Sequence, residues 1–201
     1  KRLITSIIFL SIYLVISTFY FQYIIFLIIL IYIFILIEVF LYFNKYKYLI
    51  YFYLFISFVS VLTINFDNNS IYHFNLFILT IITFDIFSYL VGKNFGKYKI
   101  IKVISPNKTL EGLIGGILFS YFFSIIYCAM FGILINITIV LFITLLIITS
   151  FIGDILESFF KRKNNIKNSS NYLPGHGGFF DRFDSFLSSI IIITLFSYFN
   201  L

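Results

Sequence analysis

Long apolar runs, separated by few charges, constrain this chain more than any other feature of its sequence. The first run extends from Leu3 to Phe43, about twice the roughly 20 residues that an α-helix needs to cross a bilayer. Further runs of span length follow, and 61% of the 201 residues are hydrophobic. The sequence therefore predicts an integral membrane protein with an all-α fold, a polytopic transmembrane helix bundle formed by a single domain over residues 1–201.

Polar residues inside these runs divide them into seven predicted spans. Gln22 is the best break signal in the first run, and Asn136 marks the break between the fifth and sixth spans. Lys1 and Arg2 precede an apolar run with no small-residue cleavage site, so we interpret the first segment as a retained span and not as a signal peptide. The predicted spans are approximately 3–21, 23–43, 48–66, 74–91, 112–135, 137–160 and 186–201.

The basic residues all fall on one side of this topology. If the N-terminus lies inside, the inside segments are 1–2, 44–47, 92–111 and 161–185, and they contain all 14 Lys and Arg residues. The positive-inside rule predicts this skew for cytoplasmic segments. Orientation thus explains the net charge of +6, and no nucleic acid partner is needed. We expect a multi-pass protein of the inner (plasma) membrane with a polar site facing the cytoplasm.

Polar side chains form stripes at the inside ends of three predicted spans. Each stripe follows the spacing i, i+3/i+4 and i+7, which places its members on one helix face. The stripes are Asp154, Glu157/Ser158 and Lys161; Asp181, Asp184/Ser185 and Ser188; and Asp85, Ser88/Tyr89 and Gly92. An ionised carboxylate deep in a span costs about 2.5–3.5 kcal/mol, so three stripes at one membrane face indicate a site. The alternative for any one residue is a salt bridge, for instance between Lys161 and either Asp154 or Glu157.

The residue types in the stripes favour binding of metal ions and phosphates. Carboxylates without a Cys or His cluster select hard cations such as Mg²⁺, and Asp154 and Asp181 on adjacent helices could hold one or two ions. Basic side chains beside them would neutralise phosphates, with arginine favoured for bidentate contact. The basic candidates are Lys161, Arg162, Lys167 and Arg182. Contact with lipid headgroups alone is the alternative, but it leaves the aspartates among them unexplained.

Two inside loops add groups suited to anions. Gly175, Gly177 and Gly178 permit close backbone approach, which suits a nest of N–H groups, although a Pro-Gly pair also makes an ordinary turn. His176 between these glycines is either a turn residue or a site residue.

The second loop, 105–112, leads into the fifth predicted span. Thr109 is a candidate N-cap there, and Glu111 favours the positive end of the helix dipole. Lys108 and Thr109 are also placed to bind a phosphate at a helix N-terminus.

Together these residues resemble the phosphatidate cytidylyltransferase (CDP-diacylglycerol synthase) family. The family signature has Ser, then Lys-Arg, Lys-Asp, a Pro-x-His-Gly-Gly turn and Asp-Arg-x-Asp. This sequence carries Ser158, Lys161-Arg162, Lys167, Pro174, His176-Gly177-Gly178, Asp181-Arg182 and Asp184 at that spacing. Three upstream family patterns are matched by Asp85 to Gly92, Ser105 to Gly112 and Gly153 to Ser158. The detailed match covers residues 85–185, with one departure: the Asp of the Lys-Asp pair is Asn168 here.

The resemblance implies the reaction CTP + phosphatidate → CDP-diacylglycerol + pyrophosphate, with Mg²⁺ as cofactor and a second cation as an option. It implies Asp154 and Asp181 as principal metal ligands, supported by Glu157, Asn168 and Asp184. Lys161, Arg162, Lys167 and Arg182 would contact phosphates during catalysis. The expected substrate-binding residues are Asp85, Ser105, Lys108, Thr109, Glu111, Ser158, His176, Gly177 and Gly178. The implied partners are CTP, phosphatidate and the bilayer, without nucleic acid, and a homodimer is one option for assembly.

Two other functions remain open. A CTP-dependent polyprenol or phytol kinase would use a similar site but transfer a phosphate and release CDP; the complete His-Gly-Gly and Asp-Arg-x-Asp block favours the cytidylyltransferase. An ion or solute transporter would also carry buried aspartates. Transporters, however, bind their substrates near the midplane on broken helices, whereas the charges here gather at one face.

Overall fold

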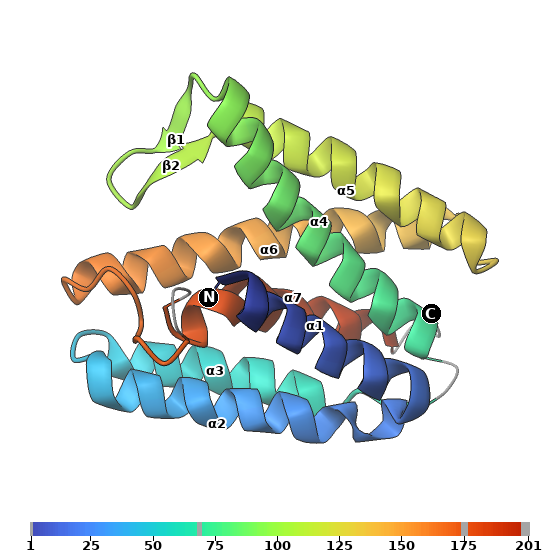
Figure 1. Cartoon of the computed structure of the whole chain (residues 1–201), viewed down its shortest axis with the longest axis horizontal. Helices are drawn as coiled ribbons and strands as arrows, with labels where there is room; N and C mark the ends of the chain where they lie inside the picture. The colour runs from blue at the N-terminus through green and yellow to red at the C-terminus, as the bar shows by residue number, and fades with distance from the viewer. Residues whose placement is uncertain (1, 68–69, 174–176, 198–201) are drawn as a thin grey trace.

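The structure, a computed structural model, describes residues 2–67, 70–173 and 177–197 (Figure 1), and side chains from residue 11 onward within these ranges up to residue 196. The prediction of a helical bundle is confirmed, since seven α-helices account for most of the described chain. The elements are α1 (Arg2–Phe19), the 3₁₀ turn η1 (Phe21–Tyr23), α2 (Ile24–Tyr42), α3 (Lys47–Leu62), α4 (Ile71–Phe95), β1 (Lys99–Ile101), β2 (Ser105–Thr109), α5 (Leu110–Met130), α6 (Ile137–Lys163) and α7 (Phe180–Ser197).

Isolated polar residues set where several helices begin. The 3₁₀ turn η1 contains Gln22 and separates α1 from α2, at the break that the sequence predicts. The Asn136 side chain accepts a hydrogen bond from the Ile139 N–H and caps α6. Thr109 caps α5 in the same way through the Gly112 N–H, at 3.2 Å. A side-chain oxygen at this position satisfies an N–H group that the helix itself leaves unpaired.

Four helical segments within the described residues are long and apolar enough to cross a membrane: Phe21–Tyr42, Ile71–Phe95, Leu110–Met130 and Ile137–Lys163. The helix α3 is apolar but has only 16 residues, and α7 carries an aspartate in its first turn. Large apolar side chains such as Phe26, Phe52 and Phe122 are exposed, which suits contact with lipid. The chain is therefore a multi-pass membrane protein.

The strands β1 and β2 form an antiparallel hairpin between α4 and α5, which corrects the all-α prediction at this point. Lys99 lies opposite Thr109, and Ile101 lies opposite Ser105. The strands are short and largely exposed, without an alternation of apolar and polar residues, so periodicity does not reveal them. Glu111 accepts hydrogen bonds from the backbone N–H groups at 97 and 98 and so ties the start of the hairpin to α5.

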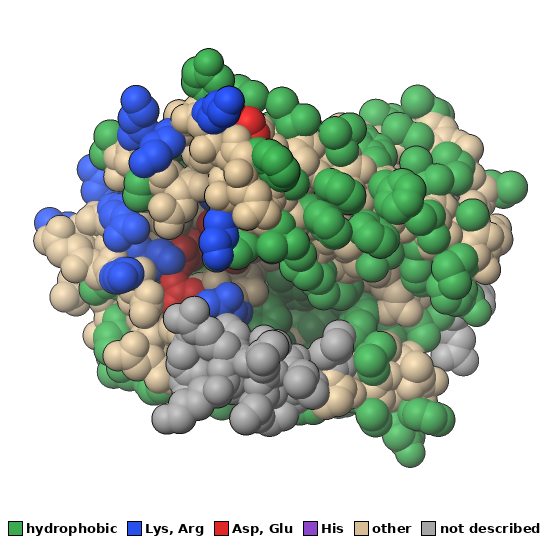
Figure 2. Space-filling view, turned by 45° about the horizontal axis from the view of Figure 1, so that its top comes forward, with side chains coloured by type: hydrophobic (Ala, Val, Ile, Leu, Met, Phe, Trp, Pro, Cys, Tyr) green, Lys and Arg blue, Asp and Glu red, His purple; other side chains and the backbone are tan. Residues whose placement is uncertain are grey.

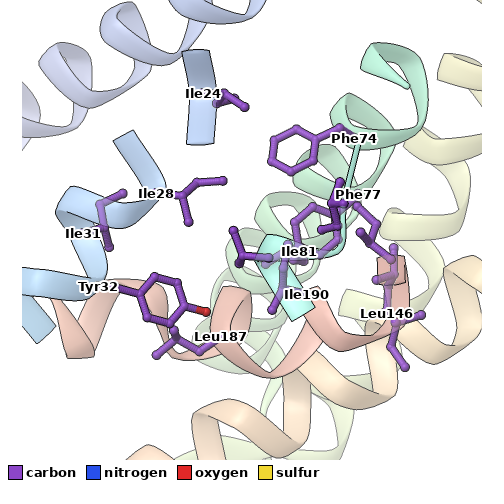
Figure 3. Close-up of a cluster of buried hydrophobic side chains, with 14 of the residues drawn as sticks. Ile24, Ile28, Ile31, Tyr32, Phe74, Phe77, Ile81, Leu146, Leu187 and Ile190 are labelled. Carbon is purple, nitrogen blue, oxygen red and sulfur yellow. The ribbon is translucent and has the colours of Figure 1, made fainter. Parts of the chain in front are cut away.

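The apolar core is enclosed by α2, α3, α4, α6 and α7. Buried side chains from these helices, among them Ile28, Phe77, Leu146 and Leu187, pack together in Figure 3. The helix α5 packs along α4, where a Cβ at Gly112 would stand 2.6 Å from the Ser88 carbonyl oxygen. A larger residue would push the two helices apart. This contact keeps the start of α5, and with it β2, beside the C-terminal end of α4.

Polar segments distant in sequence meet at one end of the bundle. In Figure 1 the hairpin, the C-terminal end of α6, the start of α7 and the α2–α3 connection all lie on the left. Asn164, directly after α6, holds the α2–α3 connection against the end of α6. Its Oδ1 accepts hydrogen bonds from the backbone N–H groups of Asn44 and Lys45. The helix ends that carry the three predicted stripes are thereby brought to a common end of the bundle.

Candidate active site

A cavity of about 300 Å³ lies at the polar end of the bundle. Its acidic lining comes from three helices: Asp85 on α4, Asp154 on α6, and Asp181 and Asp184 on α7. The basic lining residues are Lys108 on β2 and Arg182 on α7. The remaining lining residues are Phe84, Ser88, Tyr89, Ser105, Asn107, Thr109, Gly112, Leu113, Phe151 and Ser185. Each of the three stripes predicted from helical spacing therefore contributes at least one lining residue to the same cavity.

Figure 2 shows how charge is distributed around the cavity. Lys and Arg side chains crowd one half of the visible face, and Asp and Glu side chains lie in the hollow between them. The other half of this face is largely hydrophobic. A bound anion would thus meet basic side chains at the rim and carboxylates inside, an arrangement that suits an anion accompanied by a cation.

An ion pair crosses the cavity between β2 and α6. Lys108 Nζ lies 2.6 Å from Asp154 Oδ2, and the same ammonium stands 4.6 Å from the ring centroid of Phe151. The Asp154 side chain is 38% exposed, so it remains open to the cavity. Lys108 and Asp154 are thus predicted site residues that lie in direct contact.

A second ion-pair network joins α6 to α7 behind the cavity. Lys161 Nζ lies 2.6 Å from Glu157 Oε2 and 2.7 Å from Asp181 Oδ1. The salt bridge between Glu157 and Lys161 that the sequence allows is therefore present, and it includes Asp181 as well. All three side chains are at most 14% exposed. Paired charges with so little access to water are held in a fixed geometry.

Asp181 is also anchored by the loop that precedes α7. Its Oδ2 accepts hydrogen bonds from the Ser169 N–H at 2.8 Å, the Gly178 N–H at 2.9 Å and the Ser169 hydroxyl at 3.0 Å. Burial by itself would raise the pKa of Asp181. The hydrogen bond from the Gly178 N–H, together with the pairing to Lys161, outweighs burial and holds the pKa of Asp181 below the usual aspartate value. Asp181 is therefore an ionised carboxylate at neutral pH.

Serines connect the other two aspartates of the cavity. Asp85 Oδ1 lies 3.3 Å from the Ser185 hydroxyl and 3.5 Å from the Ser150 hydroxyl. Asp184 Oδ1 accepts a hydrogen bond from the Ser185 N–H at 2.9 Å. Ser185 thus contacts both carboxylates. Ser150 lies outside the predicted site residues, although it stands four residues before Asp154 on the same helix face.

Several predicted residues lie near the cavity in supporting places. Ser158 is buried in α6, and Glu111 binds the backbone before β1. Arg162 donates from Nε to the Ile104 carbonyl oxygen at 3.3 Å, which links the end of α6 to the turn of the hairpin. Ser105 and Thr109 line the cavity itself.

The remaining predicted residues are in the loop between α6 and α7. Lys167 and Asn168 are exposed. Gly177 has a φ of +88°, in the region that favours glycine, and Gly178 is buried. His176 lies outside the described residues.

The donor set of the cavity suits Mg²⁺. The described part of the chain contains no cluster of three or more Asp, Glu, His or Cys side chains that would by itself enclose a metal ion. Mg²⁺ does not require such a cage, because it keeps several waters and binds through one or two carboxylates together with substrate phosphates. Asp154, Asp181 and Asp184 supply such carboxylates in one cavity, whereas Glu157 pairs with Lys161 behind it.

Sequence reasoning missed Glu38, a fully buried carboxylate on α2. It accepts hydrogen bonds from the loop before α7 and from the first turn of that helix. A signal exists in the sequence, because Glu38 is the only charged residue in the apolar run from Leu3 to Phe43. An acid in such a place is costly unless donors surround it.

The sequence of this chain is similar to a known protein family and to several bacterial proteins. The sequence model of the cytidylyltransferase family matches residues 42–199. A phosphatidate cytidylyltransferase of Staphylococcus haemolyticus is 41% identical over 109 residues, and one of Staphylococcus aureus is 42% identical over 109 residues. One of Staphylococcus epidermidis is 41% identical over 110 residues. Each match covers 54% of this chain and 42% of the relative, which is less than half of the relative's length.

Proposed function

Because this chain belongs to the cytidylyltransferase family, which it matches over residues 42–199, we propose that it makes CDP-diacylglycerol and pyrophosphate from CTP and phosphatidate. The names of the staphylococcal relatives support this choice over a lipid kinase or a transporter. The observation that carries the proposal is the cavity in which aspartates from three helices stand beside Lys108 and Arg182.

The reaction joins two anions. A phosphate oxygen of phosphatidate attacks the α-phosphorus of CTP, the bond from that phosphorus to the bridging oxygen breaks, and pyrophosphate leaves. Lys108 and Arg182 supply positive charge where the phosphates would lie, and a guanidinium can bind two phosphate oxygens at once. The start of α5, capped by Thr109, adds the positive end of a helix dipole to the same wall.

Mg²⁺ is part of the proposal. Asp154 and Asp181 would be its principal protein ligands, with Asp184 beside them. When bound, the ion would neutralise phosphate charge and stabilise the departing pyrophosphate. Lys161 and the Gly178 N–H hold Asp181 in a fixed orientation, so this carboxylate needs little rearrangement. Lys108 holds Asp154 from the opposite wall and exchanges part of that contact for a substrate phosphate.

We also propose that all seven helices cross the inner membrane, with the cavity facing the cytoplasm. The support is the set of 14 basic residues, all of which fall in the four inside segments. CTP would then enter from the cytoplasm, and the acyl chains of phosphatidate would lie between apolar helices. In intact cells, His73→Cys should react with an impermeant maleimide, and Lys163→Cys should react only after permeabilisation. Labelling of position 163 but not position 73 from outside would reverse the orientation.

Product identity tests the proposed reaction. Membranes that contain the chain are incubated with phosphatidate, Mg²⁺ and CTP labelled either at the α- or at the γ-phosphate. The expected result is α-label in the lipid product and γ-label in pyrophosphate. Transfer of γ-label to a polyprenol or phytol, with release of CDP, would establish the kinase instead. Absence of label from lipid under both conditions would contradict both reactions.

A further inference from the structure

Glu38 on α2 holds a segment of the chain that lies more than 130 residues further along. Its Oε1 accepts hydrogen bonds from the Ser170 hydroxyl at 2.6 Å and the Phe179 N–H at 2.7 Å. Its Oε2 accepts from the Ser169 hydroxyl at 3.0 Å and the Phe180 N–H at 2.9 Å. Each carboxylate oxygen therefore has two donors, and the side chain has no exposed surface.

Two of these donors are backbone groups that α7 cannot satisfy itself. The first N–H groups of a helix have no partner within the helix, and a nearby Ser, Thr, Asp or Asn usually caps them. Phe179 and Phe180 stand at the start of α7. Their N–H groups are capped by a carboxylate from a different helix, so the position of the α7 start is fixed by α2.

The same contacts reach Asp181 in the cavity. The Ser169 hydroxyl lies 3.0 Å from Glu38 Oε2 and 3.0 Å from Asp181 Oδ2, so the two carboxylates share its single proton. Gly178, whose N–H binds Asp181, packs directly against this contact: a Cβ there would stand 2.0 Å from the Ser169 oxygen and 2.6 Å from both Glu38 oxygens. Glu38 and Asp181 therefore both accept hydrogen bonds from the same short loop.

We propose that Glu38 is a positioning residue, which fixes the loop at 169–170 and the first turn of α7 so that Asp181 stands at its place in the cavity. The proposal rests on the proposed function for the role of Asp181. Glu38 does not line the cavity, so it acts through the residues that it holds. Partners of this kind typically change metal affinity or activity by roughly 10- to 100-fold when they are removed.

The variant Glu38→Gln separates this role from simple packing. The amide keeps the shape of the carboxylate but replaces one oxygen with an NH₂ group. Whichever way the amide lies, its NH₂ faces one of the two backbone N–H groups, since each carboxylate oxygen binds one of them. A serine hydroxyl can turn to accept, but a backbone N–H cannot. One cap of α7 is therefore lost.

Tyr32→Phe is the matched control. Tyr32 is buried on the same helix, and its hydroxyl is hydrogen-bonded to Ser57 on α3. The change removes a buried hydrogen bond of α2 without touching the loop before α7. Any effect shared by both variants belongs to the packing of α2 in general.

Hydrogen exchange provides a readout that does not depend on activity. In the full chain in lipid nanodiscs, exchange of the amides at 178–181 should be faster in Glu38→Gln by roughly 10-fold or more, because a hydrogen bond to a charged group is lost. Tyr32→Phe should leave these amides unchanged. Ser170→Ala keeps both backbone contacts of Glu38, so it should give a smaller increase in the exchange rate. It provides the second test of the proposal if Glu38→Gln does not fold. Unchanged exchange of these amides in both Glu38→Gln and Ser170→Ala would overturn the proposal.

The kinetic test uses the Mg²⁺ requirement. Glu38→Gln should raise the Mg²⁺ concentration for half-maximal rate by roughly 10-fold or more, with the KM for phosphatidate equal to that of Tyr32→Phe. Faster exchange combined with an unaltered Mg²⁺ requirement would mean that Glu38 only stabilises the fold, and the positioning role would be wrong. If the unaltered chain made no CDP-diacylglycerol, the proposed function would fail, whereas the exchange measurement would still decide whether Glu38 fixes the loop.

Discussion

The α7 wall of the cavity and the hairpin wall are held in different ways. On the α7 wall, Asp181 is 8% exposed in its side chain and is bound by Lys161 and by two backbone N–H groups. At the hairpin wall, Lys108 is 15% exposed, but its partner Asp154, across the cavity on α6, is 38% exposed. Arg162 reaches the Ile104 carbonyl oxygen at 3.3 Å from an exposed position. One wall is a buried network and the other is a set of single contacts.

This difference separates two tasks of a site that joins two anions. A carboxylate that orients a cation must keep its geometry, and burial among donors achieves this because each lost bond is expensive there. A basic side chain that receives a substrate phosphate must be able to exchange its partner. The Lys108–Asp154 pair suits this task better than the Lys161–Asp181 pair, because its carboxylate is 38% exposed to the cavity against 8% for Asp181. Four substitutions probe the contrast between the walls.

Asp181→Asn should have the largest effect. The amide keeps the volume of the side chain but removes the charge that Lys161 pairs with, and it places an NH₂ group among donors. Loss of a metal ligand costs several kcal/mol of transition-state stabilisation, so turnover should fall by about 1,000-fold or more. Asp67→Asn, in the loop after α3, is the control for loss of an acid. Retention of most turnover at saturating Mg²⁺ would show that Asp181 is not a ligand.

Lys108→Gln should have the next largest effect, on the hairpin wall. It removes the ammonium that lies between Asp154 and Phe151, and a hydrogen bond to a charged group is worth about 1.5–3 kcal/mol. We expect kcat/KM for CTP to fall about 10- to 100-fold, with little change in thermal stability. Lys102→Gln removes the same charge from an exposed position of the same hairpin. Equal losses in the two variants would leave Lys108 with only a general electrostatic effect.

Arg162→Lys should reduce turnover only several-fold. Lysine keeps the charge but cannot reproduce the Nε–H contact with Ile104, and an ordinary hydrogen bond contributes about 0.5–1.5 kcal/mol. Arg162→Gln, measured in parallel, removes the charge as well. If the lysine variant is fully active and the glutamine variant is not, Arg162 acts through its charge on a phosphate, and its contact with the hairpin is incidental.

Asn168→Asp should have the smallest effect, a decrease of a few-fold in the Mg²⁺ concentration for half-maximal rate with an equal or higher maximal rate. The carboxylate restores the one charge by which this chain departs from the family pattern, and a negative charge near a divalent ion strengthens its binding. Exposure of position 168 keeps the gain small. Asn171→Asp adds the same charge elsewhere in the loop. If the Mg²⁺ concentration for half-maximal rate is unchanged or higher in Asn168→Asp, position 168 is not a ligand.

Much of the cavity could be predicted from sequence because its residues repeat at helical spacing. Asp154 and Asp85 lie on helices whose limits follow from apolar runs, so their faces could be assigned without tertiary information. The partner of each charged side chain in the site could not be assigned from the sequence. The sequence assigns Lys161 to a substrate phosphate, with a salt bridge inside α6 as the alternative, whereas the structure pairs it with both Glu157 and Asp181. Lys108 pairs with Asp154 across the cavity. Several partners were equally accessible from spacing alone, and the packing of α6 against α7 and β2 selects among them.

The helices, the membrane character and the family could be predicted from the sequence alone, because apolar runs, capping residues and signature spacing are local properties of the chain. The hairpin, whose strands lack any apolar alternation, and the contacts of Glu38 depend on how distant segments pack together. The donors to Glu38 lie between 131 and 142 residues away in sequence. No local pattern can report such a contact, since it exists only once α2 and α7 have packed together and removed the carboxylate from water.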